Sequence, residues 1–329
     1  MTKTEKLINL SGVSRSTVFR FLRGDSIRQD TKNRILSAMQ QLDILYERPL
    51  REKTGSLIIS IRPDFNYFKG YGLSIMGFMN QAELYGYTVQ LQTEQLNFPE
   101  RSNTSSCAGV LILGKTIDDE EHDIALLKKA GIPHVLVNRM FDDNSISWVS
   151  VDIQKAAKDA VAHLIELGHR EIGTWGATGH YRIDRDKRKG YEEAFREKSL
   201  PVPASRFDDA SDGVIEEVIQ RLIDENRLPP AWFAASDEVA MRLAKVVREN
   251  GLSIPEDIAL VGMDDVNPAA YMNPSLTSIH IPYQDAGAAA MDVLQLQINN
   301  PGNLSHRIVL KHRLVIRESC GAKARGREL

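Results

Sequence analysis

Residues 231–265 read AWFAASDEVAMRLAKVVRENGLSIPEDIALVGMDD, and this stretch decides the fold class of most of the chain. AWFAAS predicts a strand, VAMRLAKVVREN a helix and DIALVGMDD a second strand. Strands that alternate with helices pair in parallel. The alternation extends from SLIISI at 56–61 to about residue 320, without an internal repeat. The sequence therefore predicts an α/β body with parallel, doubly wound sheets.

The body lacks the sequence motifs of common enzyme and metal sites. It has no GxxxxGK[ST] loop, no GxGxxG run, no HExxH pair and no GxSxG turn. Cys107 and Cys320 are far apart in the sequence and are expected to be reduced thiols. No run approaches the ~20 apolar residues of a membrane span, and the N-terminus lacks a signal-peptide core. We therefore expect a soluble cytoplasmic protein that uses no metal or cofactor, is not an enzyme and does not contact membranes.

Charge is distributed unevenly along the chain. Residues 1–53 carry 11 Lys and Arg against 6 Asp and Glu, a net charge of +5, whereas the whole chain carries −3. The remaining residues therefore carry −8. A basic segment before an acidic body indicates a polyanion partner, although composition alone favours a solvated basic face.

Within the basic segment, residues 11–24 read SGVSRSTVFRFLRG and predict a turn followed by a short helix. Gly12 tolerates a positive φ, Ser14 is a good N-cap, and Val13 and Val18 are spaced for a hydrophobic staple. Other residues expected on inner helix faces are Leu7, Ile8 and Leu10, Phe21 and Leu22, and Ile35, Leu36, Met39 and Leu42 of a third helix over about 30–42. Helix, glycine turn, helix, loop and helix is the layout of a helix-turn-helix DNA-binding domain.

GVSRSTVFRFLRG resembles the G-V-S-x-x-T-V-S-R-V-L-N-G signature of the lactose-repressor/galactose-repressor (LacI/GalR) family of transcription regulators. Phe19 stands in place of the usual serine and Arg23 in place of asparagine. Body segments that resemble the same family are VSVD (149–152), HLIELGHREI (163–172), KGYEEAF (189–195), LPV (200–202), FAASDEVAMRLAKVVRENGLSIPEDIALVGMDD (233–265) and PSLTSI (274–279). The resemblance implies a periplasmic-binding-protein-like body of two Rossmann-like lobes, joined by crossing strands, with ligand in the cleft between them.

The resemblance also implies domain boundaries. The expected parts are a helix-turn-helix domain at 1–48, a shortened linker at 49–56, a ligand-sensing and dimerisation domain at 57–320 and a basic tail at 321–329. The N-lobe is expected at about 57–153 and 282–307, and the C-lobe at about 154–281 and 308–320. The tail has no leucine heptads, which favours a dimer over a tetramer.

The family pattern assigns roles in DNA binding to the second helix. Arg15 and Ser16 occupy its variable base-reading positions, and Arg20 matches an arginine that also reaches base edges. Arginine pairs well with guanine O6 and N7. Phosphate contacts, which position the domain without reading sequence, are expected from Thr17, Arg23, Lys32 and Arg34. For Phe19 two interpretations stay open: contact with a thymine methyl group, or packing back onto the first helix.

The linker departs from the family. Relatives continue with L-G-Y-x-P-N-x-x-A-R-x-L, whose last part folds into a hinge helix on DNA and inserts a leucine into the minor groove. Residues 42–58 here read LDILYERPLREKTGSLI, without the A-R-x-L part and several residues shorter. Leu50 is the minor-groove candidate; the alternative is a shortened basic linker with no hinge helix.

Carried over position by position, the effector-binding candidates are Phe65, Phe68, Arg139, Arg185, Asp237 and Asp264. Aromatic faces cover the C–H surfaces of a sugar, while carboxylates and guanidinium groups bond its hydroxyls. A structural salt bridge or core aromatic is the alternative at each position. The leading hypothesis is a homodimeric, effector-responsive transcriptional repressor that binds a double-stranded DNA operator and a small carbohydrate-like effector. The alternatives are a sugar-binding module with reduced or lost specific DNA binding, and a metabolic enzyme on a Rossmann-like body.

Overall fold

The structure is a computed structural model, and it describes residues 3–22, 27–42, 55–61, 68–96, 107–114, 117–176, 182–203, 215–300 and 305–322. The chain divides into two compact units, residues 1–55 with 84–88 and residues 56–83 with 89–329. We call the three helices of residues 3–42 the head, and the two sheets with their helices the body. Each is described by itself.

The head contains α1 (Lys3–Ser11), α2 (Arg15–Leu22) and α3 (Gln29–Gln41). Gly12, between α1 and α2, has a φ of +60°, which glycine adopts without strain. The backbone N–H of Thr17 donates to Ser14 Oγ at 3.3 Å, which confirms the predicted N-cap. Val13 and Val18 both lie in the apolar core that the three helices share. Local sequence signals therefore predicted the turn and the start of α2 correctly.

Two residues predicted to face the core of the head are exposed instead. Leu10 is 48% exposed and Leu36 is 37% exposed. In α1 the buried side chains are Leu7 and Ser11, one turn apart, so Leu10 lies at the edge of the stripe. In α3 the buried stripe includes Ile35, and Leu36 points about 100° away from it. Short helices around a small core bury only a narrow stripe each, and these two predictions were wrong for that reason.

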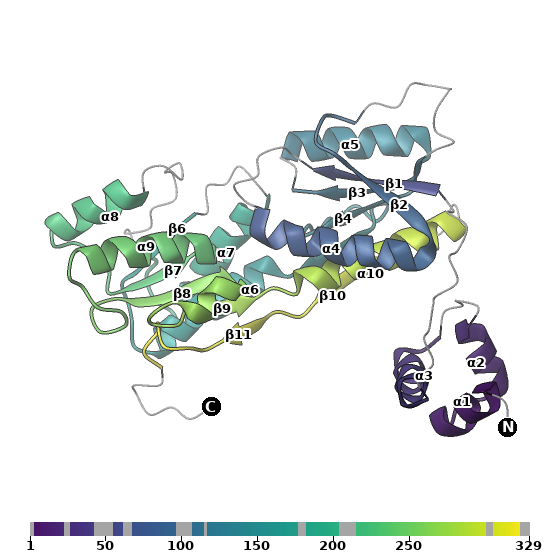
Figure 1. Cartoon of the computed structure of the whole chain (residues 1–329). Helices are drawn as coiled ribbons and strands as arrows, with labels where there is room; N and C mark the ends of the chain where they lie inside the picture. Colours follow the sequence, from purple (N-terminus) through teal and green to yellow (C-terminus); the bar gives the residue numbers. More distant parts are fainter. Residues whose placement is uncertain are drawn as a thin grey trace. The chain divides into compact units, whose positions relative to one another are not determined.

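The body contains two sheets, a six-stranded one in the order β10-β5-β4-β3-β1-β2 and a five-stranded one in the order β11-β9-β8-β7-β6 (Figure 1). The strands are β1 (Gly55–Ile61), β2 (Tyr87–Gln92), β3 (Cys107–Leu113), β4 (His134–Val137), β5 (Trp148–Val151), β6 (Ile172–Trp175), β7 (Ala231–Ala234), β8 (Ala259–Asp264), β9 (Thr277–His280), β10 (Arg307–Leu310) and β11 (Arg313–Val315). The described pairings among β1, β3, β4, β5 and β10 and among β6 to β9 are parallel. The predicted α/β class is confirmed, and β11 adds an antiparallel edge to the second sheet.

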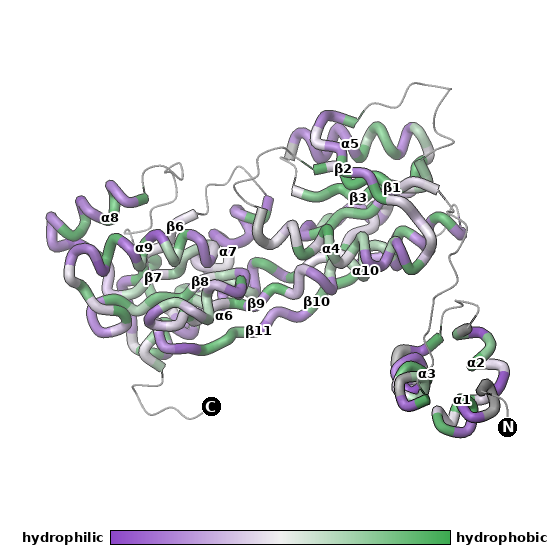
Figure 2. The backbone as a smooth tube through the Cα atoms, viewed as in Figure 1, coloured by the Kyte–Doolittle hydropathy of each residue, from purple (hydrophilic) through white to green (hydrophobic). Residues whose placement is uncertain are grey.

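Helices cover both faces of each sheet. The described helices of the body are α4 (Phe68–Tyr85), α5 (Ile117–Ala130), α6 (Ile153–Glu166), α7 (Arg182–Glu197), α8 (Ile215–Asp224), α9 (Asp237–Glu249) and α10 (Tyr283–Asn299), with a short 3-10 helix, η3, at Asn267–Tyr271. Strand β7 shows the layering, because Ala231 and Phe233 contact the α6–α7 side while Trp232 and Ala234 contact the α8–α9 side. Both sides are therefore apolar, and β3 and β7 are green in Figure 2.

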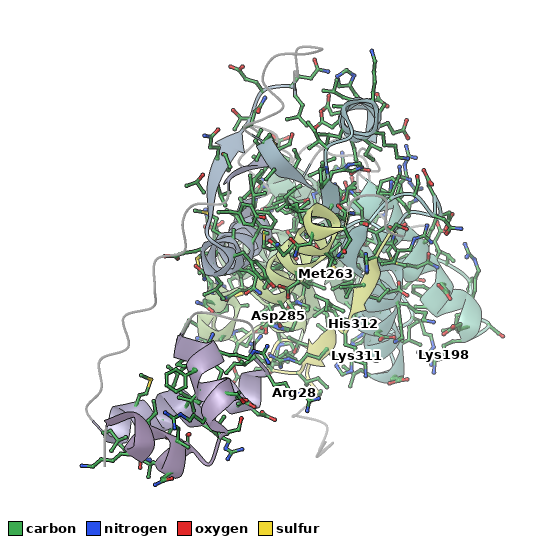
Figure 3. All side chains as sticks on the ribbon, turned by 90° about the vertical axis from the view of Figure 1, so that its right-hand side faces the viewer. Arg28, Lys198, Met263, Asp285, Lys311 and His312 are labelled. Carbon is green, nitrogen blue, oxygen red and sulfur yellow. The ribbon has the colours of Figure 1, made fainter. Side chains whose placement is uncertain are left out.

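The lobes are formed by segments distant in sequence. The described strands change from one sheet to the other three times: after β5, after β9, and between β10 and β11. The last change falls at Lys311 and His312, labelled in Figure 3, just beyond the expected lobe boundary at 307/308. His312 Nε2 lies 2.8 Å from Asp159 Oδ2 of α6, which attaches this crossing segment to the second lobe. We refer to the lobe with the six-stranded sheet as the N-lobe and to the other as the C-lobe.

Close packing of α4 on α10 places the start of α10 beside the N-lobe. A Cβ atom at Gly77 would meet the backbone of Gln284, and one at Gly287 would meet the backbone of Ser74. The two helices therefore approach each other through their glycines. This contact holds Tyr283, the first residue of α10, beside Gly70 of α4.

Candidate functional site

The end of β8 forms a strained acidic turn at the carboxyl edge of the C-lobe sheet. Asp264 is the last residue of β8 with a φ of 116°, and Asp265 follows with a φ of 56°. Non-glycine residues rarely adopt such values, and they persist only where surrounding contacts hold them. Tyr283 Oη donates to Asp264 Oδ1 at 2.6 Å. Because Tyr283 begins a helix of the N-lobe, this hydrogen bond joins the two lobes.

Asp237 supports the turn through two hydrogen bonds. It is the first residue of α9, whose N-cap Ser236 accepts from the N–H of Val239. The Asp237 carboxylate is fully buried and accepts from Ser278 Oγ at 2.5 Å and from the backbone N–H of Val266 at 2.8 Å. Both carboxylate oxygens therefore bond to groups that flank the turn. This arrangement suits a side chain that positions the 264–266 backbone.

Burial sets the protonation of this acidic pair. It raises the pKa of Asp237, and the neighbouring charge of Asp264 raises it further. Burial also raises the pKa of Asp264, against the opposing charge of Lys187. The phenol of Tyr283 likewise has its pKa raised well above the usual value by burial and by Asp264. The pair therefore holds protons to higher pH than exposed carboxyls do, and Tyr283 stays a donor.

Arg317 Nη2 pairs with Asp265 Oδ1 at 2.6 Å. The charge of Lys187 acts against the burial that raises the pKa of Asp264. On α7 the sequence prediction chose Arg185 instead of Lys187. On α7, Lys187 is 8% exposed, whereas Arg185 lies on the exposed side of the helix. The buried residues Gly190, Tyr191 and Ala194 follow Lys187 by three, four and seven positions. This periodicity was visible in the sequence and assigns Lys187 to the inner face.

On the N-lobe side, Arg139 follows β4 and forms a buried ion pair. Its Nε donates to Glu120 Oε2 at 2.7 Å, and both side chains are 2% exposed. Arg139 also interacts with the phenol of Tyr71. The charge of Asp264 and the phenol of Tyr71 both raise the pKa of Tyr283. Hydrogen bonds thus join Arg139 to Glu120 within the N-lobe and Tyr283 to Asp264 between the lobes.

Arg182 at the start of α7 makes a second contact between the lobes. Its Nε lies 3.7 Å from Glu120 Oε1, and its guanidinium lies 4.9 Å from the centre of the Phe141 ring. Its Nη2 is 3.8 Å from Glu121 of α5. Arg182 Nε and Glu120 Oε1 are both buried and have no hydrogen-bond partner among the described residues. The ion pair is therefore present but slightly too long to be a hydrogen bond.

Asn138 contributes buried polar atoms that have no partner in the described ranges of the chain. The residue is 4% exposed and has a φ of 62° at the carboxyl end of β4. Neither its side-chain nitrogen nor its side-chain oxygen has a hydrogen-bond partner among the described residues. Burying an amide without partners is costly, so Asn138 is suited to a polar partner from outside the chain. No motif in the sequence pointed to it.

The remaining effector candidates lie at the edge of what the structure describes. Phe65 is outside the described residues, and Phe68 is the first residue of α4 with a side chain that is not described. Arg139, Asp237 and Asp264 lie near the lobe junction as set out above, and they stay candidates there. Tyr283, Asn138, Glu120, Arg182 and Lys187 are the polar residues of this region that sequence reasoning did not select.

The predicted DNA-binding residues share one exposed side of the head. Arg15, Ser16, Phe19 and Arg20 are all exposed on α2, opposite the buried Val18. Thr17 and Lys32 are partly buried, and Arg34 Nη2 donates to the carbonyl of Gly12 at 2.8 Å. Arg23 and Leu50 lie outside the described residues. Helix α2 therefore presents both a basic and an aromatic group to solvent.

Other site classes find no support in the described ranges. Within them, no three His, Cys, Asp or Glu side chains are grouped to hold a metal ion. Cys107 and Cys320 are both free. No described helix combines the length and apolar character needed to cross a membrane.

Comparison with known proteins agrees with this architecture. Residues 161–320 match the model of the periplasmic binding protein-like domain. Catabolite control protein A of Priestia megaterium is 30% identical over 324 residues, covering 94% of this chain and 96% of that protein. A transcriptional regulator CelR–cellobiose complex has a TM-score of 0.70 at 25% identity, covering 97% of this chain and 100% of that one. A LacI-family regulatory protein from Chloroflexus aggregans has the same fold, with a TM-score of 0.69 at 24% identity over 80% of this chain and 98% of that one. A helix-turn-helix head, two parallel-sheet lobes and relatives that match along nearly the full length establish that the chain belongs to the LacI/GalR family of transcription regulators.

Proposed function

We propose that this protein is a homodimeric repressor whose head binds a near-palindromic operator and whose body binds a small carbohydrate-like effector between the lobes. The observation that carries the proposal is the hydrogen bond from Tyr283 to Asp264, because it couples the lobes at the turn where a ligand would bond. An effector that favours one lobe arrangement shifts the population of that arrangement. Lobe closure then alters the spacing of the two heads in the dimer.

The chemistry around the lobe junction suits a polyhydroxylated ligand. The Asp264 carboxylate accepts from Tyr283 and from the backbone N–H of Asp237, and the positive charge of Lys187 acts on it, so a ligand hydroxyl there would join an existing polar network. Asn138 supplies an amide donor and an amide acceptor for which the described part of the chain provides no partner. Sugar hydroxyls donate and accept at the same atom, so they satisfy such mixed groups well. The cellobiose bound to CelR supports a saccharide as the class of effector.

A thermal-shift screen of monosaccharides, disaccharides and sugar phosphates tests the effector proposal. A ligand that binds only the folded body raises the melting temperature, and the stabilisation grows with the logarithm of its concentration over Kd. Asp264→Asn is expected to abolish the shift, while the exposed Glu217→Gln on α8 is expected to retain it. An equal shift in both variants would place the effector elsewhere.

The head is proposed to bind the operator through α2. Arg15, Ser16 and Arg20 are exposed together where the second helix of a helix-turn-helix enters the major groove. Arg15→Ala is expected to relax base preference at one operator position. Lys32 is a predicted phosphate contact. Lys32→Ala is therefore expected to weaken binding to all DNA sequences alike and to reduce the salt dependence of the affinity. Mobility shifts at several salt concentrations distinguish these effects, and uniform weakening by Arg15→Ala would contradict its role as a base reader.

A second copy of the chain is proposed to cover the exposed face of α4. Leu73, Met76 and Met79 are 40%, 50% and 41% exposed and follow one another at three-residue intervals. Apolar side chains in such a stripe favour a protein partner, and a symmetric operator requires two heads. Met76→Glu is expected to yield monomers in light scattering, while Glu217→Gln stays dimeric. A dimeric Met76→Glu protein would exclude α4 as the interface.

A further inference from the structure

Arg15 and Phe19 interact on the exposed surface of α2. The guanidinium carbon of Arg15 lies 5.7 Å from the centre of the Phe19 ring, within the range of a cation–π contact. Phe19 is 38% exposed. The apolar core described for the head includes Leu7 and Val18 but not Phe19. Of the two interpretations that the sequence left open for this ring, its exposure and its contact with Arg15 favour contact with DNA.

An exposed phenylalanine here has no evident role in stability. The ring contributes little to the buried core, and a small polar residue would be compatible with the same position on the helix. The contact with Arg15 instead restricts the long arginine side chain, which otherwise loses much rotamer freedom on binding. The pair is therefore better explained by what α2 contacts than by how the head folds.

Stacking leaves the hydrogen-bonding edge of Arg15 available. A guanidinium group donates in its plane, whereas it stacks on aromatic rings through its face. Arg15 can therefore rest on Phe19 and still present two parallel N–H groups to guanine O6 and N7. Four residues of helix rise by about 6 Å, and neighbouring bases are about 3.4 Å apart. The backbone rise is thus less than two base-pair steps, and the two contacting side chains, 5.7 Å apart, can reach adjacent base pairs.

We propose that Arg15 and Phe19 act as one unit that reads a guanine next to a thymine. The edge of Arg15 pairs with the guanine, and the Phe19 ring covers the C5-methyl group of the neighbouring thymine. That methyl group is the apolar feature of the major-groove code. The inference rests on the proposed DNA-binding role of the head and adds a specificity-determining residue to it.

The experiment begins with operator sequences enriched from a random duplex library by the full chain. The enriched half-site is expected to contain a guanine and a thymine in adjacent positions. Replacing that thymine with deoxyuridine removes only the methyl group. Fluorescence anisotropy is expected to show about three- to fivefold weaker binding of the deoxyuridine operator. In Phe19→Ser, which carries the serine usual in the family, the two operators are expected to bind equally.

Leu10→Ser is the matched control, because Leu10 is an exposed apolar side chain of α1, outside the proposed reading surface. It is expected to retain the preference for thymine over deoxyuridine. The inference is overturned if wild type binds both operators equally, if Phe19→Ser keeps the preference, or if the enriched site lacks the guanine–thymine step. In those cases the head still reads DNA. Failure to enrich any sequence would overturn the proposed function itself and this inference with it.

Discussion

Tyr283 Oη lies 2.6 Å from Asp264 Oδ1 and joins the first residue of α10 to the last residue of β8. One residue belongs to a helix packed on the N-lobe sheet and the other to a strand of the C-lobe sheet. Burial of both groups strengthens the bond, because little water competes for it. A change at this pair is therefore expected to alter both the stability of the body and its response to effector.

Tyr283→Phe removes the donor but keeps the ring that packs beside Gly70. We expect the free energy of unfolding to fall by about 2 kcal/mol, because a buried carboxyl loses its hydrogen bond. Urea unfolding of the full chain measures this loss. Tyr271→Phe is the control, since Tyr271 is 87% exposed and its loss of a hydroxyl is expected to have no effect. Equal stability of the two variants would mean that the Tyr283 bond contributes nothing.

Lys187→Met and Arg185→Met test which cation of α7 binds the effector. The structure favours Lys187, whereas the sequence predicted Arg185. Lys187 is buried beside the acidic turn, while Arg185 is exposed on the same helix. We expect Lys187→Met to weaken binding of the screened saccharide by roughly tenfold or more, as expected for loss of a buried charged partner. Arg185→Met is expected to change it less than about twofold. Isothermal titration measures the saccharide affinity of both variants. A larger loss of affinity in Arg185→Met than in Lys187→Met would identify Arg185 as the binding residue.

Arg182→Gln tests the second contact between the lobes. Arg182 reaches Glu120, Glu121 and Phe141 of the N-lobe from the start of α7. Because its side chain is partly exposed, its ion pair is screened and contributes modestly. We expect small-angle scattering without effector to show a larger radius of gyration, as lobe opening becomes more populated. Arg188→Gln, whose partner Glu192 lies on the same helix, is expected to scatter like wild type.

The acidic turn predicts a pH dependence of stability. The pKa of Asp237 is raised by burial and by Asp264, so above about pH 4 the folded chain retains a proton that the unfolded chain has released. The free energy of unfolding therefore decreases as pH rises toward the native pKa, by at most about 1.4 kcal/mol per pH unit for one proton.

Urea unfolding at one-unit intervals from pH 5 to pH 8 measures that slope. Asp237→Asn removes one of the two titrating carboxyls of the turn and is expected to reduce the slope. Asp224→Asn, at the C-terminal end of α8, is expected to retain the wild-type slope. An unchanged slope in Asp237→Asn would show that Asp237 does not titrate between the folded and unfolded states in this interval.

The fold class and the helical head followed from the sequence because their signals are local. Ser14 caps α2 by accepting from the N–H of Thr17, three positions away. Gly12 allows the turn before α2 through its own positive φ. Alternating apolar strands and amphipathic helices permit few arrangements other than parallel sheets. The same local signals overestimated the core of the head, where Leu10 and Leu36 are exposed.

Sequence alone thus determined the helix-turn-helix layout, the α/β class and Asp264 as a residue of the β8 turn, since each depends on neighbours within a few positions. The pairing of Asp264 with Tyr283, and the burial of the Asn138 amide without a partner among the described residues, were decided only by the tertiary structure. Both depend on how helices and strands distant in the sequence are placed against each other. That placement results from packing across the whole body, which no short stretch of sequence encodes.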